Sequence, residues 1–317
     1  MKKTAFLFPG QGAQYVGMGK DFYDQFLEAK EVFQEANDIL GESLSNLIFE
    51  GPSDQLTQTK NSQKAIFVVS IALLRVLQKQ LPDLVPNVCA GLSLGEYSAV
   101  AASGKMFFKD ALLLVQSRAL YMQQSCEENA GTMRVILGLE APAVEEAISK
   151  LQPKHAVWVA NINCPGQIVI SGDEPGIEAA SATLKEMGAK RVLPLEVSGA
   201  FHSGLMQDAQ KKLEPKIEQA ALYESNIALV MNIPGGYVKN LVDIRENLIR
   251  QVTGTVRWEQ GIRSMLCEGV DLFIEIGCGK TLSGMNKKIG VASDAILSLE
   301  KVADLETLAR CHATISV

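Results

Sequence analysis

The chain has 317 residues, of which 47% are hydrophobic and 21% are charged, a composition typical of a folded globular protein rather than a disordered or fibrous one. Its net charge of −6 argues against a nucleic-acid partner, which would need a basic surface. No apolar run approaches the roughly 18 to 20 residues needed to cross a bilayer, and the N-terminal apolar run is too short for a signal peptide. The six cysteines lack the spacing of a disulfide framework or a metal site. We therefore expect a cytoplasmic protein without a membrane partner.

The predicted elements of the first third alternate between strand and helix. Residues 4–8 form a short apolar run closed by Pro9 and Gly10, which predicts a buried strand entering a glycine-rich loop that a helix follows. Apolar spacing and turn residues then predict the following elements: a helix over 61–81, a strand over 87–91, a helix over 95–103 and a helix over 109–127.

Between residues 126 and 198 the elements become shorter. The predicted order is strand 132–139, helix 143–151, strand 156–161, strand 167–171, helix 176–187 and strand 190–197. This βαββαβ order is the ferredoxin-like arrangement, so we interpret residues 126–198 as a subdomain inserted into a larger one made of residues 1–125 and 199–317.

After the insertion the alternation of strands and helices resumes. The predicted elements are strand 227–231, helices 244–251 and 258–268, strand 271–276 and a glycine-rich loop at 277–279. The larger domain is therefore expected to be a hydrolase-like α/β sheet with helices on both faces.

Residues 91–95 read Gly-Leu-Ser-Leu-Gly, a G-x-S-x-G pentapeptide between a predicted strand and a predicted helix. The glycines allow a turn tight enough to hold Ser93 in a strained conformation at the tip of the strand. The N–H of Leu94, at the start of the helix, would point toward a developing oxyanion. The alternative is an ordinary Gly-Ser turn without catalytic function.

A serine hydroxyl needs a base to become a nucleophile, and histidine is the usual base near neutral pH. Of the three histidines, His155 and His312 are expected to be solvated surface residues. His202 lies where the predicted insertion ends, and such junctions commonly line clefts. His202 is therefore the candidate base, with a purely structural histidine as the alternative.

Arg118 falls on the apolar face of its predicted helix, four residues from both Leu114 and Met122. A buried guanidinium needs a carboxylate partner, because an unpaired buried charge is costly. That partner is either an internal residue such as Glu96 or the carboxylate of a substrate.

Gln11 and Gln14 lie in the loop after the first predicted strand. Glycines on both sides of Gln11 would bring its backbone close to the occupant of a cleft, so its N–H could serve as a second oxyanion donor. A surface turn explains this loop equally well.

Five linked motifs resemble those of the malonyl-CoA:acyl carrier protein transacylases in order and spacing. They are Phe8-Pro-Gly-Gln-Gly-Ala-Gln14, Gly91-Leu-Ser-Leu-Gly-Glu-Tyr-Ser98, Gln116-Ser-Arg118, Gly199-Ala-Phe-His-Ser203 and Gln251-Val-Thr-Gly-Thr-Val-Arg-Trp258. The similarity covers essentially the whole chain. It implies a hydrolase-like α/β domain that carries a ferredoxin-like insertion.

The resemblance also implies a reaction. In that family a serine accepts the malonyl group from malonyl-CoA and passes it to the phosphopantetheine thiol of the carrier protein, without a metal or redox cofactor. The implied roles here are Ser93 as nucleophile, His202 as base, Arg118 as ligand of the malonyl carboxylate, and Gln11 and Leu94 as oxyanion donors. Gln251 would orient His202 through its backbone carbonyl, in place of a triad acid.

Two further residues receive substrate roles from the resemblance. Asn161 is assigned to substrate binding, and Phe201 resembles the bulky residue that leaves malonyl-selective members little room for an α-methyl group. The chain departs from the family pattern at four positions: Leu92 replaces the usual histidine, Arg134 a small residue, and Thr255 and Cys278 each a proline. Leu92 and Arg134 leave the fine acyl preference open.

The expected partners are a coenzyme A thioester and, transiently, an acyl carrier protein, and we expect a monomer. Because those carriers are acidic and this chain is itself negative, docking requires a local basic patch. The candidates are Lys190 with Arg191 and Lys287 with Lys288. Each pair could equally well consist of ordinary solvated surface residues without a docking role. Three other functions stay open: a trans-acting loader of a polyketide carrier, a G-x-S-x-G thioesterase or hydrolase, and a non-catalytic scaffold subunit.

Overall fold

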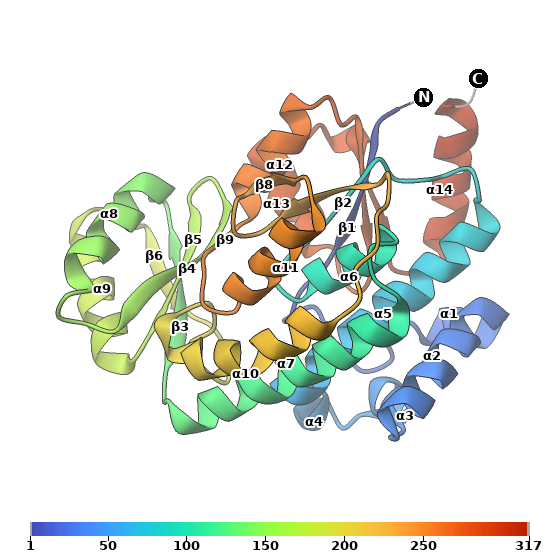
Figure 1. Ribbon diagram of the computed structural model, residues 1–317. Helices are drawn as coiled ribbons and strands as arrows, with labels where there is room; N and C mark the ends of the chain where they lie inside the picture. The colour runs from blue at the N-terminus through green and yellow to red at the C-terminus, as the bar shows by residue number, and fades with distance from the viewer. Residues whose placement is uncertain (1, 316–317) are drawn as a thin grey trace.

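The structure is a computed structural model that describes residues 2–315, with side chains through residue 311. Two β-sheets, each accompanied by helices, stand side by side (Figure 1). The predicted α/β class is confirmed. None of the helices in the described part of the chain is long and apolar enough to span a membrane.

The larger sheet has six strands in the order β11-β10-β1-β2-β7-β8. Their bounds are β1 Thr4–Phe8, β2 Val88–Gly91, β7 Ala228–Met231, β8 Gly236–Val238, β10 Leu272–Ile276 and β11 Ile296–Leu299. All neighbours pair in parallel except β7 and β8, which are antiparallel. The loops that follow β1, β2, β7 and β10 therefore emerge at the same edge of this sheet.

Alternation along β1 divides the core of the larger unit into two layers. Phe6 and Phe8 face one layer, whereas Ala5 and Leu7 face the other, and all four side chains are buried. The first layer is covered by α5 Thr59–Gln80, α6 Gly95–Ala102, α7 Phe108–Glu128, α10 Gln207–Gln219, α11 Leu241–Arg250 and α14 Val302–Ile315. The second is covered by α12 Trp258–Cys267 and α13 Thr281–Ile289.

Four short helices precede α5 and pack along its outer side (Figure 1). They are α1 Lys20–Gln25, α2 Leu27–Leu40, α3 Leu44–Glu50 and α4 Ser53–Thr57. The sequence predicts only one helix in this segment.

The smaller sheet has the order β6-β3-β5-β4-β9. Its elements are β3 Thr132–Leu137, α8 Ala141–Leu151, β4 Val157–Cys164, β5 Gln167–Gly172, α9 Glu174–Glu186, β6 Arg191–Pro194 and β9 Val256–Arg257. One face packs on α8 and α9, with Ile136, Ile168 and Ile170 among its buried residues. The fifth strand, β9, comes from beyond residue 198 and pairs in parallel with β4, so the chain returns to this sheet after leaving it.

Candidate active site

Ser93 lies in the turn between β2 and α6 with a φ of 51°, in the left-handed region that non-glycine residues seldom adopt. The turn is so tight that neither flanking glycine could carry a side chain. A Cβ on Gly91 would lie 1.9 Å from the backbone of Gly95, and a Cβ on Gly95 would lie 2.1 Å from the carbonyl oxygen of Phe8. The predicted nucleophile elbow therefore has the expected geometry.

The Ser93 hydroxyl lies 2.7 Å from Nε2 of His202. The other ring nitrogen, Nδ1, lies 2.8 Å from the backbone carbonyl of Gln251, so Nδ1 carries the proton and donates it to that carbonyl. Nε2 is then free to accept from Ser93. The imidazole is 3% exposed, and burial, together with the positive charge of Arg118, lowers the pKa of His202 to about 4.

Arg118 is 1% exposed, and its predicted burial is confirmed. Its guanidinium donates to Gln63 Oε1 at 2.6 Å, to Gln251 Oε1 at 2.9 Å and to Ser93 Oγ at 3.0 Å. Among the residues that the structure describes, the Nε of Arg118 has no hydrogen-bond partner, and this atom is buried. The guanidinium is thus held by neutral oxygens and keeps a free donor.

The amides of Asn232 and Gln63 complete this arrangement, although the sequence singles out neither. Asn232, just after β7, accepts from the N–H of Ser93 at 2.8 Å and donates to the carbonyl of Gly91 at 2.8 Å. One sequence feature could have predicted a role for Asn232. It directly follows β7, which pairs in parallel with β2, so the loops after the two strands lie at the same edge of the sheet.

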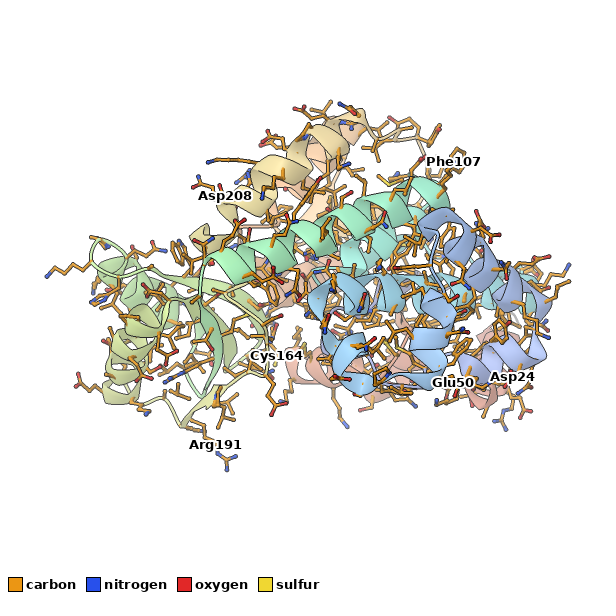
Figure 2. All side chains as sticks on the ribbon, turned by 90° about the horizontal axis from the view of Figure 1, so that it is seen from below. Asp24, Glu50, Phe107, Cys164, Arg191 and Asp208 are labelled. Carbon is orange, nitrogen blue, oxygen red and sulfur yellow. The ribbon has the colours of Figure 1, made fainter. Side chains whose placement is uncertain are left out.

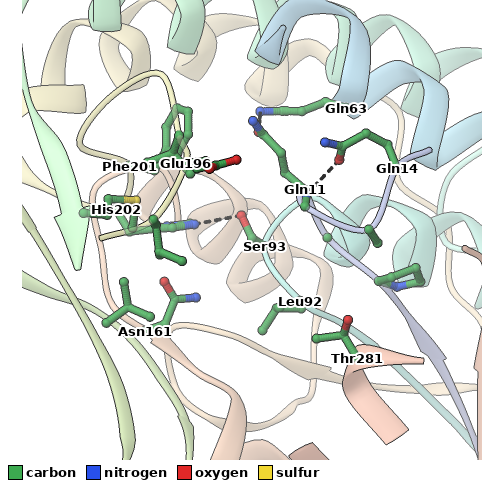
Figure 3. Close-up of a pocket in the computed structure, with 18 of the residues that line it drawn as sticks. Gln11, Gln14, Gln63, Leu92, Ser93, Asn161, Glu196, Phe201, His202 and Thr281 are labelled. Atoms are coloured by element: carbon green, nitrogen blue, oxygen red, sulfur yellow. Dashed lines mark hydrogen bonds between the residues drawn. The ribbon is translucent and has the colours of Figure 1, made fainter. Parts of the chain in front are cut away.

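A cavity of about 630 Å³ opens at Ser93. The loop after β1 and helices α5, α7 and α13 border it on one side, and the face of the smaller sheet away from α8 and α9 borders it on the other (Figure 3). Gln11, Ser93, Asn161, Phe201 and His202 all line it. In the described part of the chain, the N–H groups of Gln11 and Leu94 have no hydrogen-bond acceptor, so both are free to donate hydrogen bonds to an oxyanion.

The positions that depart from the family pattern differ in their relation to this cavity. Leu92 lines the cavity. Arg134 lies on the opposite face of its strand, where it pairs with Glu174 and Glu178 of α9, so its side chain cannot contact an acyl group at Ser93. Thr255 donates to the carbonyl of Val159 at 2.7 Å, and Cys278 is buried.

The two basic pairs are exposed, and none of their four side chains lines the cavity. The side-chain carbons of Lys190 pack on Gly138, whose N–H donates to Gly166 in the turn between β4 and β5. Burial raises the pKa of the Cys164 thiol at the end of β4, and the charge of Lys288 lowers it, which places Lys288 near the same turn. Figure 2 shows Arg191 projecting from the smaller unit and Cys164 on its side toward the larger unit.

Of the other two histidines, His155 is partly exposed, and the side chain of His312 lies outside the described residues. In the part of the chain that the structure describes, no group of three or more His, Cys, Asp or Glu side chains could hold a metal ion.

Comparison with known proteins places this geometry in a family. Residues 5–297 match the family model described as acyl transferase domain. The chain is 44% identical over 309 residues to a malonyl CoA-acyl carrier protein transacylase of Bacillus subtilis, covering 97% of this chain and 96% of that protein. It is 38% identical to the Escherichia coli K12 transacylase of the same name over 289 residues, covering 91% and 93%.

Solved structures give the same result. An acyl carrier protein S-malonyltransferase from Vibrio cholerae superposes with a TM-score of 0.92 at 38% identity, covering 96% of this chain and 99% of that one. A malonyl-transacylase in complex with its type II PKS acyl-carrier protein superposes with a TM-score of 0.90 at 35% identity, covering 96% and 98%.

Proposed function

We propose that this chain, which belongs to the acyl transferase domain family, transfers the malonyl group of malonyl-CoA to the phosphopantetheine thiol of an acyl carrier protein and so supplies fatty-acid synthesis. The transfer proceeds through a malonyl ester of Ser93. The observation that carries this proposal is the position of the Ser93 hydroxyl, 2.7 Å from the acceptor nitrogen of His202 and 3.0 Å from the guanidinium of Arg118.

In the first half-reaction Ser93 Oγ attacks the thioester carbonyl while its proton passes to His202 Nε2. The tetrahedral oxyanion is stabilised by the free N–H groups of Gln11 and Leu94. Collapse breaks the bond from carbon to sulfur, and the coenzyme A thiolate leaves with the proton from His202. The backbone carbonyl of Gln251 holds the imidazole in the required tautomer throughout.

In the second half-reaction the phosphopantetheine thiol gives its proton to His202, and its sulfur attacks the ester carbonyl of malonyl-Ser93. The bond to Ser93 Oγ breaks, and the serine regains its proton from His202. This ping-pong sequence uses only acid-base and nucleophilic groups of the chain, and we propose that it requires no metal or redox cofactor.

Arg118 selects the acyl group. A guanidinium binds a carboxylate through two parallel hydrogen bonds. The Nε of Arg118 is buried, and Arg118 is not among the residues that line the cavity, so the malonyl carboxylate would have to replace Ser93 Oγ as an acceptor of the guanidinium. Phe201 and Asn161 line the same cavity and contact the acyl group or its carrier arm. The clamp also fixes the acyl ester, which disfavours attack by water and separates this proposal from a G-x-S-x-G hydrolase.

The acyl carrier protein docks on the basic pairs Lys190 with Arg191 and Lys287 with Lys288. Both pairs are exposed near the turn between β4 and β5. Gln167, the first residue of β5, lines the cavity. A carrier bound there could send its phosphopantetheine arm to Ser93. The related malonyl-transacylase seen with a type II PKS acyl-carrier protein supports such a partner.

Further proposals concern the organisation of the chain. The order β6-β3-β5-β4 with α8 and α9 on one face supports a ferredoxin-like insertion at residues 126–198 in a domain of residues 1–125 and 199–317. We also propose that the protein is a monomer and works in the cytoplasm. Its free cysteines fit a reducing compartment.

A single turnover assay tests the proposed function. Protein, malonyl-CoA and phosphopantetheinylated carrier are mixed, and both malonyl-carrier and free malonate are measured by mass spectrometry. We expect stoichiometric malonyl-carrier with little malonate. Malonate as the main product would indicate a hydrolase, and unreacted malonyl-CoA would indicate a non-catalytic scaffold.

A further inference from the structure

Glu96 is a wholly buried carboxyl group beside the active site, in the first turn of α6. Burial raises the pKa of Glu96, whereas the N–H of Asn232, the charge of Arg118 and the amide of Gln251 each lower it. Burying a carboxyl group is unfavourable. The reaction as described above does not use Glu96, so its burial calls for an explanation.

The two oxygens of Glu96 bind two separate segments of the chain. Oε1 accepts from the backbone N–H of Asn232, after β7, at 2.6 Å. Oε2 accepts from the side-chain amide of Gln251, after α11, at 2.7 Å. One side chain on α6 therefore joins two loops that the sequence separates by 19 positions.

Each segment in turn holds part of the reacting constellation. The Asn232 side chain accepts from the N–H of Ser93 at 2.8 Å. Gln251 binds His202 through its backbone carbonyl at 2.8 Å, and its side-chain oxygen accepts from Arg118 at 2.9 Å. The Gln251 amide also donates to the Ser93 carbonyl at 2.8 Å.

We propose that Glu96 is a positioning residue that fixes Ser93, His202 and Arg118 relative to one another by tying the Asn232 and Gln251 segments together. This inference rests on the proposed function, because it assumes that Ser93 is acylated with His202 as base. It also explains why a carboxyl group is buried at this place. The amide of Gln251 lies between Glu96 and Arg118 and bonds to both, so the carboxyl group acts through this amide.

The variant Glu96→Gln tests the proposal at almost unchanged side-chain volume. Both oxygens of Glu96 face N–H donors, whereas a glutamine offers one acceptor and one NH₂ group. The NH₂ group of the glutamine would then face the N–H donor of either the Asn232 segment or the Gln251 segment, and that segment would move away. A displacement near 1 Å in an active site can lower a rate about 100-fold, so we expect the maximal rate of Ser93 malonylation to fall about 10- to 100-fold.

Rapid-quench mass spectrometry separates positioning from folding. We expect the variant to reach full labelling, one malonyl group per chain, at the lowered maximal rate. The malonyl-CoA concentration for half-maximal rate should change less than about threefold, because the contacts of the coenzyme are untouched. Full labelling at the rate of the unsubstituted protein would overturn the proposal. Partial labelling at that same rate would also overturn it, since it would show a loss of folded protein only.

Glu275→Gln is the matched control. Glu275 is 1% exposed and likewise accepts two backbone N–H groups, from Leu282 and Ser283. In the described part of the chain it makes no hydrogen bond to Ser93, to His202 or to the Asn232 and Gln251 segments that hold them. We expect this control to lose thermal stability and to keep the malonylation rate. An equal fall in rate in both variants would overturn the assignment to Glu96.

Glu96→Asp serves if Glu96→Gln does not fold. Its carboxylate is shorter by one carbon, about 1.5 Å, and can reach only one of the two segments, so the same fall in rate is expected. Malonylation of the unsubstituted protein is measured in the same experiment. If the unsubstituted protein is not malonylated, the proposed function is contradicted. If the unsubstituted protein and the Glu96 variant are malonylated at equal rates, only the inference about Glu96 is contradicted.

Discussion

The Ser93 hydroxyl contacts two groups, a neutral imidazole and a cationic guanidinium. His202 is held as the neutral tautomer by the backbone carbonyl of Gln251, while the cationic Arg118 donates to the oxygen of Ser93 at 3.0 Å. A cation at that oxygen stabilises negative charge as the proton leaves. The same cation disfavours protonation of His202, so the base stays available well below neutral pH.

The pH dependence of Ser93 reactivity follows from this arrangement. The pKa of His202 is lowered to about 4, so we expect the second-order rate of modification by a neutral fluorophosphonate to be constant from pH 7 down to about 5. Below pH 4 the rate should fall about tenfold per unit. A fall centred near pH 6.5, the ordinary pKa of histidine, would contradict the buried neutral base.

The same shift has a consequence for stability. Because the folded pKa lies below the unfolded value, the unfolded chain binds more protons between pH 6.5 and about 4. The free energy of unfolding should therefore decrease as the pH falls through this window. Denaturant titrations at pH 7 and pH 5 should show a smaller decrease in His202→Asn than in the unsubstituted protein. An equal decrease in both would contradict the shift.

Arg118→Ala should separate binding of the malonyl carboxylate from general reactivity. Losing a charged hydrogen-bonded pair costs about 2 to 3 kcal/mol, so the rate of malonyl-CoA loading should fall about 100-fold. Loading from acetyl-CoA, which has no carboxylate, should fall much less, because it loses only the contact of Arg118 with Ser93 Oγ. Parallel measurements of both thioesters decide the point, since equal losses would count against the clamp.

Sequence reasoning located the reacting groups better than their supports. Ser93, His202, Arg118 and Gln11 each stand in a pattern with a chemical meaning. Gln11, Ser93 and His202 line one cavity, whereas the buried Arg118 reaches it only through its hydrogen bond to Ser93 Oγ. Asn232 and Gln63 were not predicted. Each contributes only an uncharged side-chain amide, which binds the N–H of Ser93 in one case and the guanidinium of Arg118 in the other. Such contacts depend on where the loops meet, which a linear pattern does not show.

At the scale of elements, the turn from β2 to α6 is the tightest part of the site. A methyl group on Gly95 would lie 2.1 Å from the Phe8 carbonyl oxygen, and neither backbone segment can yield without moving β1 or β2. Gly95→Ala should therefore lower the free energy of unfolding by at least about 2 kcal/mol, as overpacked substitutions do. It should also abolish malonylation of Ser93.

Gly284→Ala is the control for this prediction. Gly284 lies within α13, and a Cβ there would meet no atom within 4 Å. Alanine in a helix is more favourable than glycine by up to about 1 kcal/mol, so this variant should be unchanged or more stable. Denaturant unfolding of both variants makes the comparison, and equal stabilities would contradict the tight approach of α6 to β1.

The elements were predictable where apolar patterns are long or closed by glycine and proline. The strands β1, β2, β7 and β10 and the helices α5 to α7 lie within a few residues of their predicted bounds. The strands β8 and β9 have three and two residues, too few for a periodic pattern. They exist because β7 and β4 offer free edges, a tertiary effect.

At the scale of the molecule, the cavity lies between two sheets that the chain connects more than once. The pair β4 and β9 joins the smaller sheet to the segment that follows Gln251. The exposed basic pairs lie near the turn between β4 and β5, and none of their four side chains lines the cavity. A net charge of −6 repels an acidic carrier at long range, so local charges near the mouth dominate at contact.

Reversing Lys287 and Lys288 to Glu should raise the apparent KM for the carrier protein about tenfold or more at low salt, and less at high salt. Malonylation of Ser93 by malonyl-CoA should be unchanged. The control reverses Arg75 and Lys79, two exposed cations at the far end of α5, which changes net charge equally. Equal effects of the two double variants would mean that net charge, and not this patch, governs docking.

The most direct measurement is the intact mass of the protein after brief exposure to malonyl-CoA without a carrier, for the unsubstituted chain and for Ser93→Ala. We predict that the unsubstituted protein gains the mass of one malonyl group, which addition of phosphopantetheinylated carrier removes as malonyl-carrier. Ser93→Ala, folded by its thermal transition, should gain none. A malonyl adduct that persists in Ser93→Ala, or transfer to the carrier by that variant at the unsubstituted rate, would contradict the malonyl-serine intermediate.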